Sequence, residues 1–234
     1  MISLRAGEAV AEIAPGRGAI CTGLRIGDQE LLYLDQSTFV DLTKSVRGGI
    51  PILFPIAGKP PEGSPLAQHG WARNLSWQPT QTAANALECR LANDGFDLLL
   101  TYTLSERSLL MAMNIQGDGG PFQLGFHPYF NCLDKAAARV DTKATRALDN
   151  QTGNEFPYSP PDFANTQPDL RLLDHREAGT ILHRGAQPPI KLRFSPEFKL
   201  LVLWTQPGKT FVCVEPWTPR FLQAPQSLSF EILL

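Results

Sequence analysis

The sequence predicts an all-β protein, a large antiparallel β-sandwich with few short helices. Short apolar runs recur along the chain with an alternation of period two, the repeat of a strand with one buried face. With 19 glycines and 20 prolines in 234 residues, the chain has many turns, yet too few breakers for disorder. No window keeps an apolar helical period over three turns. Only Phe39–Val46 and Asp174–Leu182 are candidates for short helices.

The expected strands are separated by residues that favour turns. Pro15-Gly16 and Gly27-Asp28 divide the first runs, and Asn93-Asp94-Gly95 between two apolar runs is a strong hairpin signal. In chain order, the expected strands are Glu8–Ile13, Ala19–Ile26, Leu31–Leu34, Leu75–Pro79, Ala86–Leu91, Phe96–Leu104, Ser108–Ile115, Ile190–Phe194, Lys199–Trp204, Thr210–Glu215 and Leu228–Leu233. No internal repeat or linker divides the chain, so we expect one domain over residues 1–234.

The stretch Phe122–Phe130 is expected to be a strand with two different faces. Alternation places Phe122, Leu124, Phe126 and Phe130 on a core face, and it places Gln123, Gly125, His127 and Tyr129 on the other. An imidazole, a phenol and an amide beside a glycine favour a small-molecule site at His127. A buried histidine satisfied by a neighbour is the alternative.

Composition gives no reason to propose a macromolecular partner. The formal net charge of −2 favours neither nucleic acid nor a membrane surface. The N-terminus lacks the apolar run of a signal peptide, and no apolar stretch reaches the length of a membrane span. The cysteines are far apart, without metal-ligand spacing, and we expect reduced, half-buried thiols in a cytoplasmic protein: Cys21, Cys89, Cys132 and Cys213.

Two segments rich in proline, glycine and polar residues, Gly58–Gln68 and Gln151–Asp169, are long for loops in a compact domain. Such loops favour functional rims, although a surface insertion is an equal alternative for the second. Arg47 precedes two glycines before the first loop, and His69 and Arg73 follow that loop. Both ends of the loop could therefore face one pocket. Alternatively, Arg47 forms a surface ion pair while the other two are ordinary strand-edge residues.

A carboxylate ends the apolar run Thr210–Glu215. By period two, Glu215 shares a face with Phe211 and Cys213. Glutamate is rare in strands and seldom buried alone, and apolar flanks would raise its pKa towards that of a general base. The alternative is a strand-end side chain that faces solvent before Pro216.

Four ordered motifs resemble the aldose 1-epimerase (galactose mutarotase-like) superfamily, and most closely its hexose-6-phosphate mutarotase branch. The motifs are Arg47-Gly48-Gly49-Ile50-Pro51, His69-Gly70-Trp71-Ala72-Arg73-Asn74, Gly125-Phe126-His127-Pro128-Tyr129-Phe130 and Val212-Cys213-Val214-Glu215-Pro216. The resemblance implies an antiparallel sandwich with a sugar site on its concave face. It implies that His127 and Glu215 are the catalytic pair and that Arg47, His69 and Arg73 bind substrate.

The chain also departs from the family pattern. Family members commonly continue after the first motif with proline, tryptophan, phenylalanine and glycine, whereas this chain has Pro55-Ile56-Ala57-Gly58. An aromatic wall of the sugar site is therefore expected to be missing. The family also has an aspartate between the histidine and glutamate motifs. Asp169 and Asp174 both fit this position, and we favour Asp169 as a substrate-binding residue.

The residue types fit the interconversion of α and β sugar anomers without a metal or redox cofactor. Opening a cyclic hemiacetal needs a base for the C1 hydroxyl and an acid for the ring oxygen. We expect Glu215 as base and His127, as imidazolium, as acid, on opposite sides of a pyranose ring. The substrate is then a sugar or sugar phosphate. The alternatives are a free-sugar epimerase, a non-catalytic carbohydrate-binding protein and a metal-dependent β-barrel, for which the four histidines lack close spacing.

Overall fold

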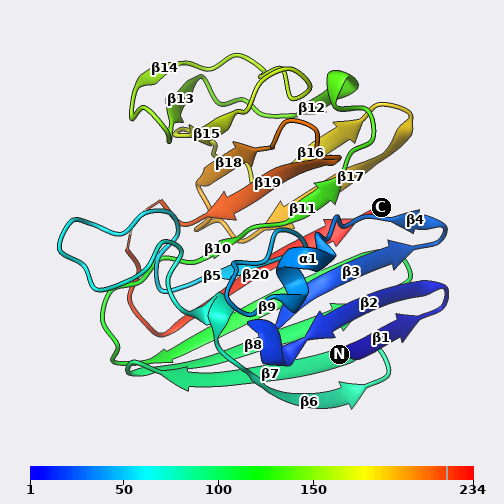
Figure 1. Cartoon of the computed structure of the whole chain (residues 1–234). Coiled ribbons are helices and arrows are strands. Elements are labelled where there is room, and N and C mark those ends of the chain that lie inside the picture. The colour runs from blue at the N-terminus through cyan, green and yellow to red at the C-terminus, as the bar shows by residue number, and fades with distance from the viewer. Residues whose placement is uncertain (220) are drawn as a thin grey trace.

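The computed structural model describes residues 1–219 and 221–234, and its strands form three sheets (Figure 1). Every pair of neighbouring strands within these sheets is antiparallel, which confirms the predicted all-β sandwich. Helical structure in the described residues is limited to short elements. These are α1 (Gln36–Val40) and the 3-10 turns η1 (Pro15–Arg17), η2 (Ala72–Asn74) and η3 (Lys135–Ala137).

The first sheet holds the N-terminal strands in chain order and lies in blue at the lower front of Figure 1. Its strands are β1 (Ile2–Ala6), β2 (Ala9–Ala14), β3 (Ile20–Ile26) and β4 (Gln29–Glu30). The second sheet has the order β14-β13-β15-β18-β19-β10-β5, and β11 also pairs with β19. Its strands are β5 (Ile52–Leu53), β10 (Gly125–Phe126), β11 (Tyr129–Asn131), β13 (Arg146–Asp149), β14 (Glu155–Pro157), β15 (Asp169–Leu172), β18 (Leu200–Trp204) and β19 (Phe211–Trp217).

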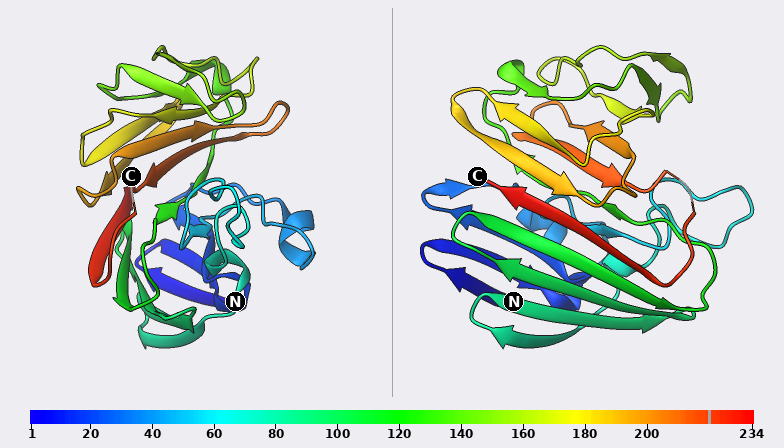
Figure 2. Two further views of the ribbon diagram at one scale, coloured as in Figure 1. Left: turned by 90° about the vertical axis from the view of Figure 1, so that its left-hand side faces the viewer. Right: turned by 180° about the vertical axis from the view of Figure 1, so that it is seen from behind.

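The third sheet has the order β12-β16-β17-β20-β9-β8-β7-β6 and contains the longest strands. Its strands are β6 (Gln78–Ala83), β7 (Ala86–Asn93), β8 (Phe96–Leu104), β9 (Ser108–Gly117), β12 (Ala138–Val140), β16 (Gly179–Arg184), β17 (Gln187–Phe194) and β20 (Gln226–Leu233). The predicted hairpin at Asn93-Asp94-Gly95 joins β7 to β8, with positive φ at Asp94 and Gly95. In the turned view of Figure 2, the blue N-terminal strands lie on the opposite side from the red strand β20.

The core lies between the sheets and draws on all three of them. Leu4 of the first sheet, Phe126 of the second and Phe230 of the third belong to one buried cluster. The Phe126 and Phe230 rings stack with their centroids 5.3 Å apart. A fully buried ring of this kind contributes about 1.5–3 kcal/mol through its loss of contact with water. Because one face of the second sheet is committed to this core, polar side chains gather on its other face.

Neither expected helix is found at its predicted position. The chain forms a helix at Gln36–Val40 rather than at Phe39–Val46. Asp35 caps the N-terminus of this helix by accepting a hydrogen bond from the Ser37 N–H. Asp174–Leu182 is not helical, because Gly179–Arg184 pairs with β17 as a strand. Tertiary pairing overrides the weak local propensity there.

Phe122–Phe130 is also not one continuous strand, since β10 ends at Phe126 and β11 begins at Tyr129. Pro128 between them has no N–H for a ladder hydrogen bond. The two faces are nevertheless as predicted: Phe122, Leu124, Phe126 and Phe130 are fully buried in the core.

The pairing register with β19 is the same on both sides of this break. Gly125 pairs with Trp217 and Tyr129 pairs with Cys213, so the same register places His127 opposite Glu215. On the other edge of β19, Glu215 pairs with Val202 of β18. Three strands therefore carry adjoining side chains on the face away from the core.

Gly49 gives a test of how the first motif is folded. Its φ is +61°, and a Cβ there would meet the Cys21 carbonyl oxygen at 2.4 Å. We expect Gly49→Ala to lower the free energy of unfolding by about 1–3 kcal/mol, measured by urea denaturation. Gly16→Ala is the control, since Gly16 has no positive φ and open space at its Cβ, and it should leave stability unchanged or slightly raised. Equal effects of the two substitutions would show that neither the positive φ of Gly49 nor its closeness to the Cys21 carbonyl requires a glycine.

Candidate active site

A cleft of about 390 Å³ opens on the second sheet, on the face away from the core. Strands β11, β15, β18 and β19 form its floor, and the segments on both sides of the Gly58–Gln68 loop form part of its rim. The six residues predicted for the site all line this cleft: Arg47, His69, Arg73, His127, Asp169 and Glu215. The loop Gly58–Gln68 contributes Gly58, Lys59 and Gln68 to the cleft, as expected of a functional rim.

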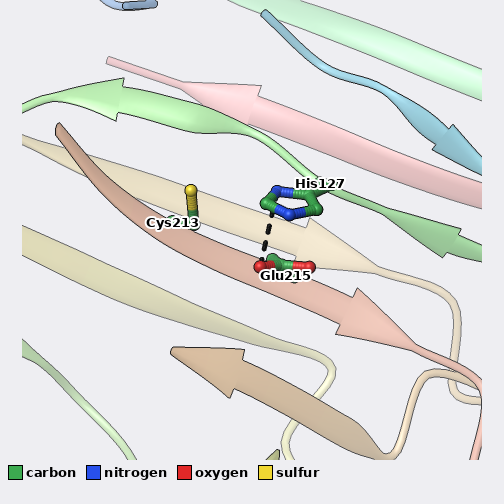
Figure 3. A group of neighbouring side chains, drawn as sticks. All are labelled: His127, Cys213 and Glu215. Atoms are coloured by element: carbon green, nitrogen blue, oxygen red, sulfur yellow. Dashed lines mark ion pairs between the residues drawn. The ribbon is translucent and has the colours of Figure 1, made fainter. Parts of the chain in front are cut away.

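His127 and Glu215 are in direct contact at the floor of the cleft (Figure 3). His127 Nδ1 lies 3.4 Å from Glu215 Oε1, and the two residues are 8% and 1% exposed. The expectation of an acid and a base on opposite sides of a pyranose ring is therefore wrong. The shared register of β10, β11 and β19 holds the two groups side by side, too close for a ring to fit between them.

Burial dominates the electrostatics of Glu215. It raises the pKa of this carboxyl well above its usual value, and the nearby Asp169 raises it further. The Trp217 N–H, which donates to Glu215 Oε2 at 3.0 Å, and the Arg73 guanidinium oppose this rise. A carboxyl with a raised pKa is a stronger base than an exposed one, as general base catalysis near neutral pH requires.

The same burial has the opposite effect on the histidine. It lowers the pKa of His127 well below the usual value, and the nearby His69, Arg73 and Arg47 lower it further. Nδ1 is buried and has no hydrogen-bond partner among the described residues. The protein groups around His127 therefore disfavour the imidazolium that the sequence led us to expect. Within the pair, they favour a proton on Glu215.

His69 closes the loop at the rim. The backbone N–H of His69 donates to the Gly58 carbonyl at 2.8 Å, and the backbone N–H of Gly58 donates to the ring nitrogen His69 Nδ1 at 3.1 Å. Burial, followed by the charge of Arg73, lowers the pKa of His69 to about 3, so the ring is neutral at physiological pH. Because Nδ1 accepts a hydrogen bond, the proton of the neutral ring is on Nε2, which makes that nitrogen a donor.

The two predicted arginines approach the cleft from different segments. The Arg47 guanidinium lies over the Trp204 ring, 5.3 Å from its centroid, and no ion pair holds it among the described residues. Arg73 donates to the Gln68 carbonyl at 3.0 Å, and its charge lies close enough to affect the pKa values of His69 and His127. The surface ion pair that was the alternative for Arg47 is therefore not found among the described residues.

The structure separates the two candidate aspartates. Asp169 begins β15, lines the cleft and accepts a hydrogen bond from Asn150 Nδ2 at 2.8 Å. Asp174 instead accepts hydrogen bonds from the Thr145 hydroxyl and from the backbone N–H groups of Thr145 and Arg146, and it does not line the cleft. Only Asp169 lies close enough to affect the pKa of Glu215.

The segment after Pro55 contributes no aromatic side chain to the cleft. Trp204 and Trp217 line the cleft from β18 and β19 instead, and Trp217 packs against Ala57 of that segment. Neither tryptophan was predicted from the sequence. Trp217 follows Glu215 by two residues, so alternation could have placed it on the same face. Arg171 and Asn150 were also missed, and no local pattern marks them.

A thiol lies beside the acid–base pair, as Figure 3 shows. Ligand atoms of His127, Cys213 and Glu215 lie within 4.8 Å of one another, a donor set that a divalent cation such as Zn²⁺ could use. Burial and the nearby Glu215 raise the pKa of Cys213 well above its usual value, which opposes the thiolate that a metal requires. The charges of Arg47 and Arg73 also act on this site and disfavour a cation.

The four cysteines are free and fully buried, rather than half-buried as expected. In the part of the chain that the structure describes, no helix has the length and apolar character to span a membrane.

A large antiparallel sandwich whose cleft holds a buried histidine and glutamate in contact fits a sugar-converting isomerase that uses an acid and a base. The sequence model of the family described as aldose 1-epimerase matches residues 1–231. The chain therefore belongs to the aldose 1-epimerase family, which confirms the resemblance of its four motifs.

Similar proteins agree with this assignment. A "Putative glucose-6-phosphate 1-epimerase" from Salmonella typhimurium (strain LT2) is 40% identical over 243 residues, covering 88% of this chain and 78% of that protein. A protein with the same description from Cenchrus ciliaris is 30% identical over 246 residues, covering 88% and 74%. The crystal structure of the Slr1438 protein from Synechocystis sp. PCC 6803 superposes with a TM-score of 0.89 at 32% identity, covering 99% of this chain and 94% of that one.

The raised pKa of Glu215 predicts a cost to stability. The folded state keeps this proton to higher pH than the unfolded chain, so stability falls as the pH rises through the unfolded value of about 4.3. Glu215→Gln should therefore raise the free energy of unfolding at neutral pH, by about 1–2 kcal/mol. The gain should shrink towards pH ~4, where Glu215 is protonated in both states. Urea denaturation at several pH values measures this, and a variant less stable than wild type at neutral pH would contradict it.

Proposed function

We propose that this chain interconverts the α and β anomers of a hexose 6-phosphate by opening and closing the sugar ring. The observation that carries the proposal is the contact between His127 and Glu215 on the floor of a cleft that Arg47 and Arg73 also line. The names of the two curated relatives support the phosphorylated substrate, because both are described as glucose-6-phosphate 1-epimerases.

The contact suits the reaction because both reacting oxygens are attached to C1. Ring opening starts from the form of the pair in which the proton is on His127 and Glu215 is a carboxylate. Glu215 Oε1 then takes the proton of the C1 hydroxyl while His127 gives its proton to the ring oxygen, and the bond between C1 and that oxygen breaks. The C1–C2 bond then turns, and the ring closes with the two roles reversed, so no proton is gained or lost overall. We expect each group to accelerate ring opening by about 10²–10⁴-fold.

A phosphate between Arg47 and Arg73 would also offset part of what keeps His127 neutral, although burial is the larger cause. The positive charges of both guanidiniums lower the pKa of His127. A phosphate dianion paired with them would offset those charges and favour the imidazolium that the acid step needs. Binding of a phosphorylated sugar would therefore raise the pKa of His127, whereas binding of a free sugar would not.

The remaining cleft residues suit the sugar ring. Asp169 can accept hydrogen bonds from sugar hydroxyls, and His69 Nε2, which lies 3.3 Å from the Gln68 side-chain amide, can donate one if that amide turns away. Trp204 and Trp217 offer apolar surfaces against which the C–H faces of a pyranose can pack. We also propose that residues 1–234 form a single domain, which is supported by one core cluster that contains residues from Leu4 to Ile232.

Removing either member of the pair should abolish the acceleration. We expect Glu215→Gln and His127→Ala each to lower the rate of anomer exchange of glucose 6-phosphate by at least about 10²-fold, measured by exchange NMR. Neither variant should unfold the protein, because neither side chain belongs to the main core cluster. Glu106→Gln, in the exposed turn between β8 and β9, is the control and should keep the wild-type rate. A fully active Glu215→Gln variant would rule out the proposed base.

The arginines should distinguish phosphorylated from free sugars. Arg73→Ala is expected to weaken the binding of glucose 6-phosphate by about 1.5–3 kcal/mol, the range of a hydrogen bond to a charged group, and to change little for free glucose. Dissociation constants from calorimetry for both sugars provide the measurement, with the exposed Arg90→Ala on β7 as control. Equal losses for both sugars would point to a free-sugar aldose epimerase instead.

A further inference from the structure

The indole of Trp217 fills a slot that the fold keeps free for it. The residue ends β19 and is 4% exposed. A Cβ at Gly125 would meet Trp217 Cδ1 at 2.8 Å, and a Cβ at Gly58 would meet Cζ3 at 3.0 Å. The Arg171 guanidinium lies 5.6 Å from the ring centroid, and the His69 ring packs against it at 5.8 Å. Two glycines and two cationic or polar side chains therefore fix the plane of this ring.

Among the described residues, the Trp217 ring makes one hydrogen bond, and its partner is Glu215. Trp217 Nε1 donates to Glu215 Oε2 at 3.0 Å, while Glu215 Oε1 lies 3.4 Å from His127 Nδ1. The two oxygens of the carboxylate are thus not equivalent. One is held by the indole, and the other lies beside the histidine.

We propose that Trp217 is the positioning residue for the base of this enzyme: its N–H holds Glu215 Oε2 and leaves Oε1 as the oxygen that takes the substrate proton. The inference rests on the proposed function of Glu215. Trp217 acts through the carboxylate.

The N–H also sets how readily the carboxyl gives up its proton. An N–H bonds a carboxylate more strongly than a carboxylic acid, so this bond favours the charged form. It works with Arg73 and against burial and Asp169. The titratable or charged groups that act on or contact Glu215 are His127, Tyr129, Asp169, Arg73 and Cys213. Arg171 acts through the ring, since a guanidinium over an indole face is held there by a cation–π attraction.

The direct test is Trp217→Phe, which keeps an aromatic ring in the slot and removes the N–H. For glucose 6-phosphate, the acid limb of the pH profile of kcat/KM should move to higher pH by about one unit, a tenfold loss of activity on that limb. Trp204→Phe removes a cleft indole with no bond to Glu215, and it should leave the acid limb in place whatever its effect on KM. If Trp217→Phe lowers kcat but leaves the acid limb at the same pH, Trp217 has only a packing role.

A measurement on the wild-type protein keeps the inference testable if Trp217→Phe does not fold. The indole N–H resonances of the four tryptophans can be assigned with single Trp→Phe variants at Trp71, Trp77 and Trp204. The Trp217 resonance should titrate with the midpoint of the acid limb, and Glu215→Gln should abolish that titration. A resonance that does not move while the activity rises would overturn the positioning role. No acceleration by wild type, together with a titrating resonance, would instead overturn the proposed function and leave the bond intact.

Discussion

The site depends on the pairing register between β19 and the two short strands β10 and β11. That register fixes which residue of Phe122–Phe130 lies opposite the carboxylate, and it places His127 against Glu215 although Pro128 interrupts the ladder. A slip of β10 and β11 by one residue would turn His127 into the core, because successive side chains alternate between faces. The core rings of Phe126 and Phe230, stacked on the other face, oppose such a slip. Packing on the core face of the sheet thus keeps His127 and Glu215 in contact on the other face.

Burying an acid and a base side by side costs stability, and the surroundings offset that cost only in part. Glu215 has one hydrogen bond, from Trp217, and His127 Nδ1 has none among the described residues. Such incompletely satisfied polar groups are uncommon in protein interiors. In this cleft they leave free capacity for hydrogen bonds that a sugar can complete. The proposed reaction uses this capacity, because the C1 hydroxyl and the ring oxygen need partners that are not already engaged.

Alternation along single strands predicted the polar face of the site, but not its contacts. Period two correctly placed His127 on the face away from the core and Glu215 on one face with Phe211 and Cys213, because it depends only on neighbours in one strand. It could not give the distance between them, since register across strands depends on loops and on pairing over about ninety residues of sequence. The choice of Asp169 over Asp174 similarly depends on how β15 pairs with β18. Arg171 reaches the cleft through the same pairing. Trp217, by contrast, could have been predicted from its place two residues after Glu215.

The central claim is that one acid–base pair in contact serves the two oxygens of a single carbon. A crystal structure of the inactive Glu215→Gln variant with glucose 6-phosphate tests it most directly. The account predicts that the C1 hydroxyl lies within about 2.6–3.2 Å of the residue 215 side chain and the ring oxygen at a similar distance from His127, with the phosphate between Arg47 and Arg73. A sugar bound with C1 remote from both side chains, or a phosphate on the other side of the cleft, would contradict it.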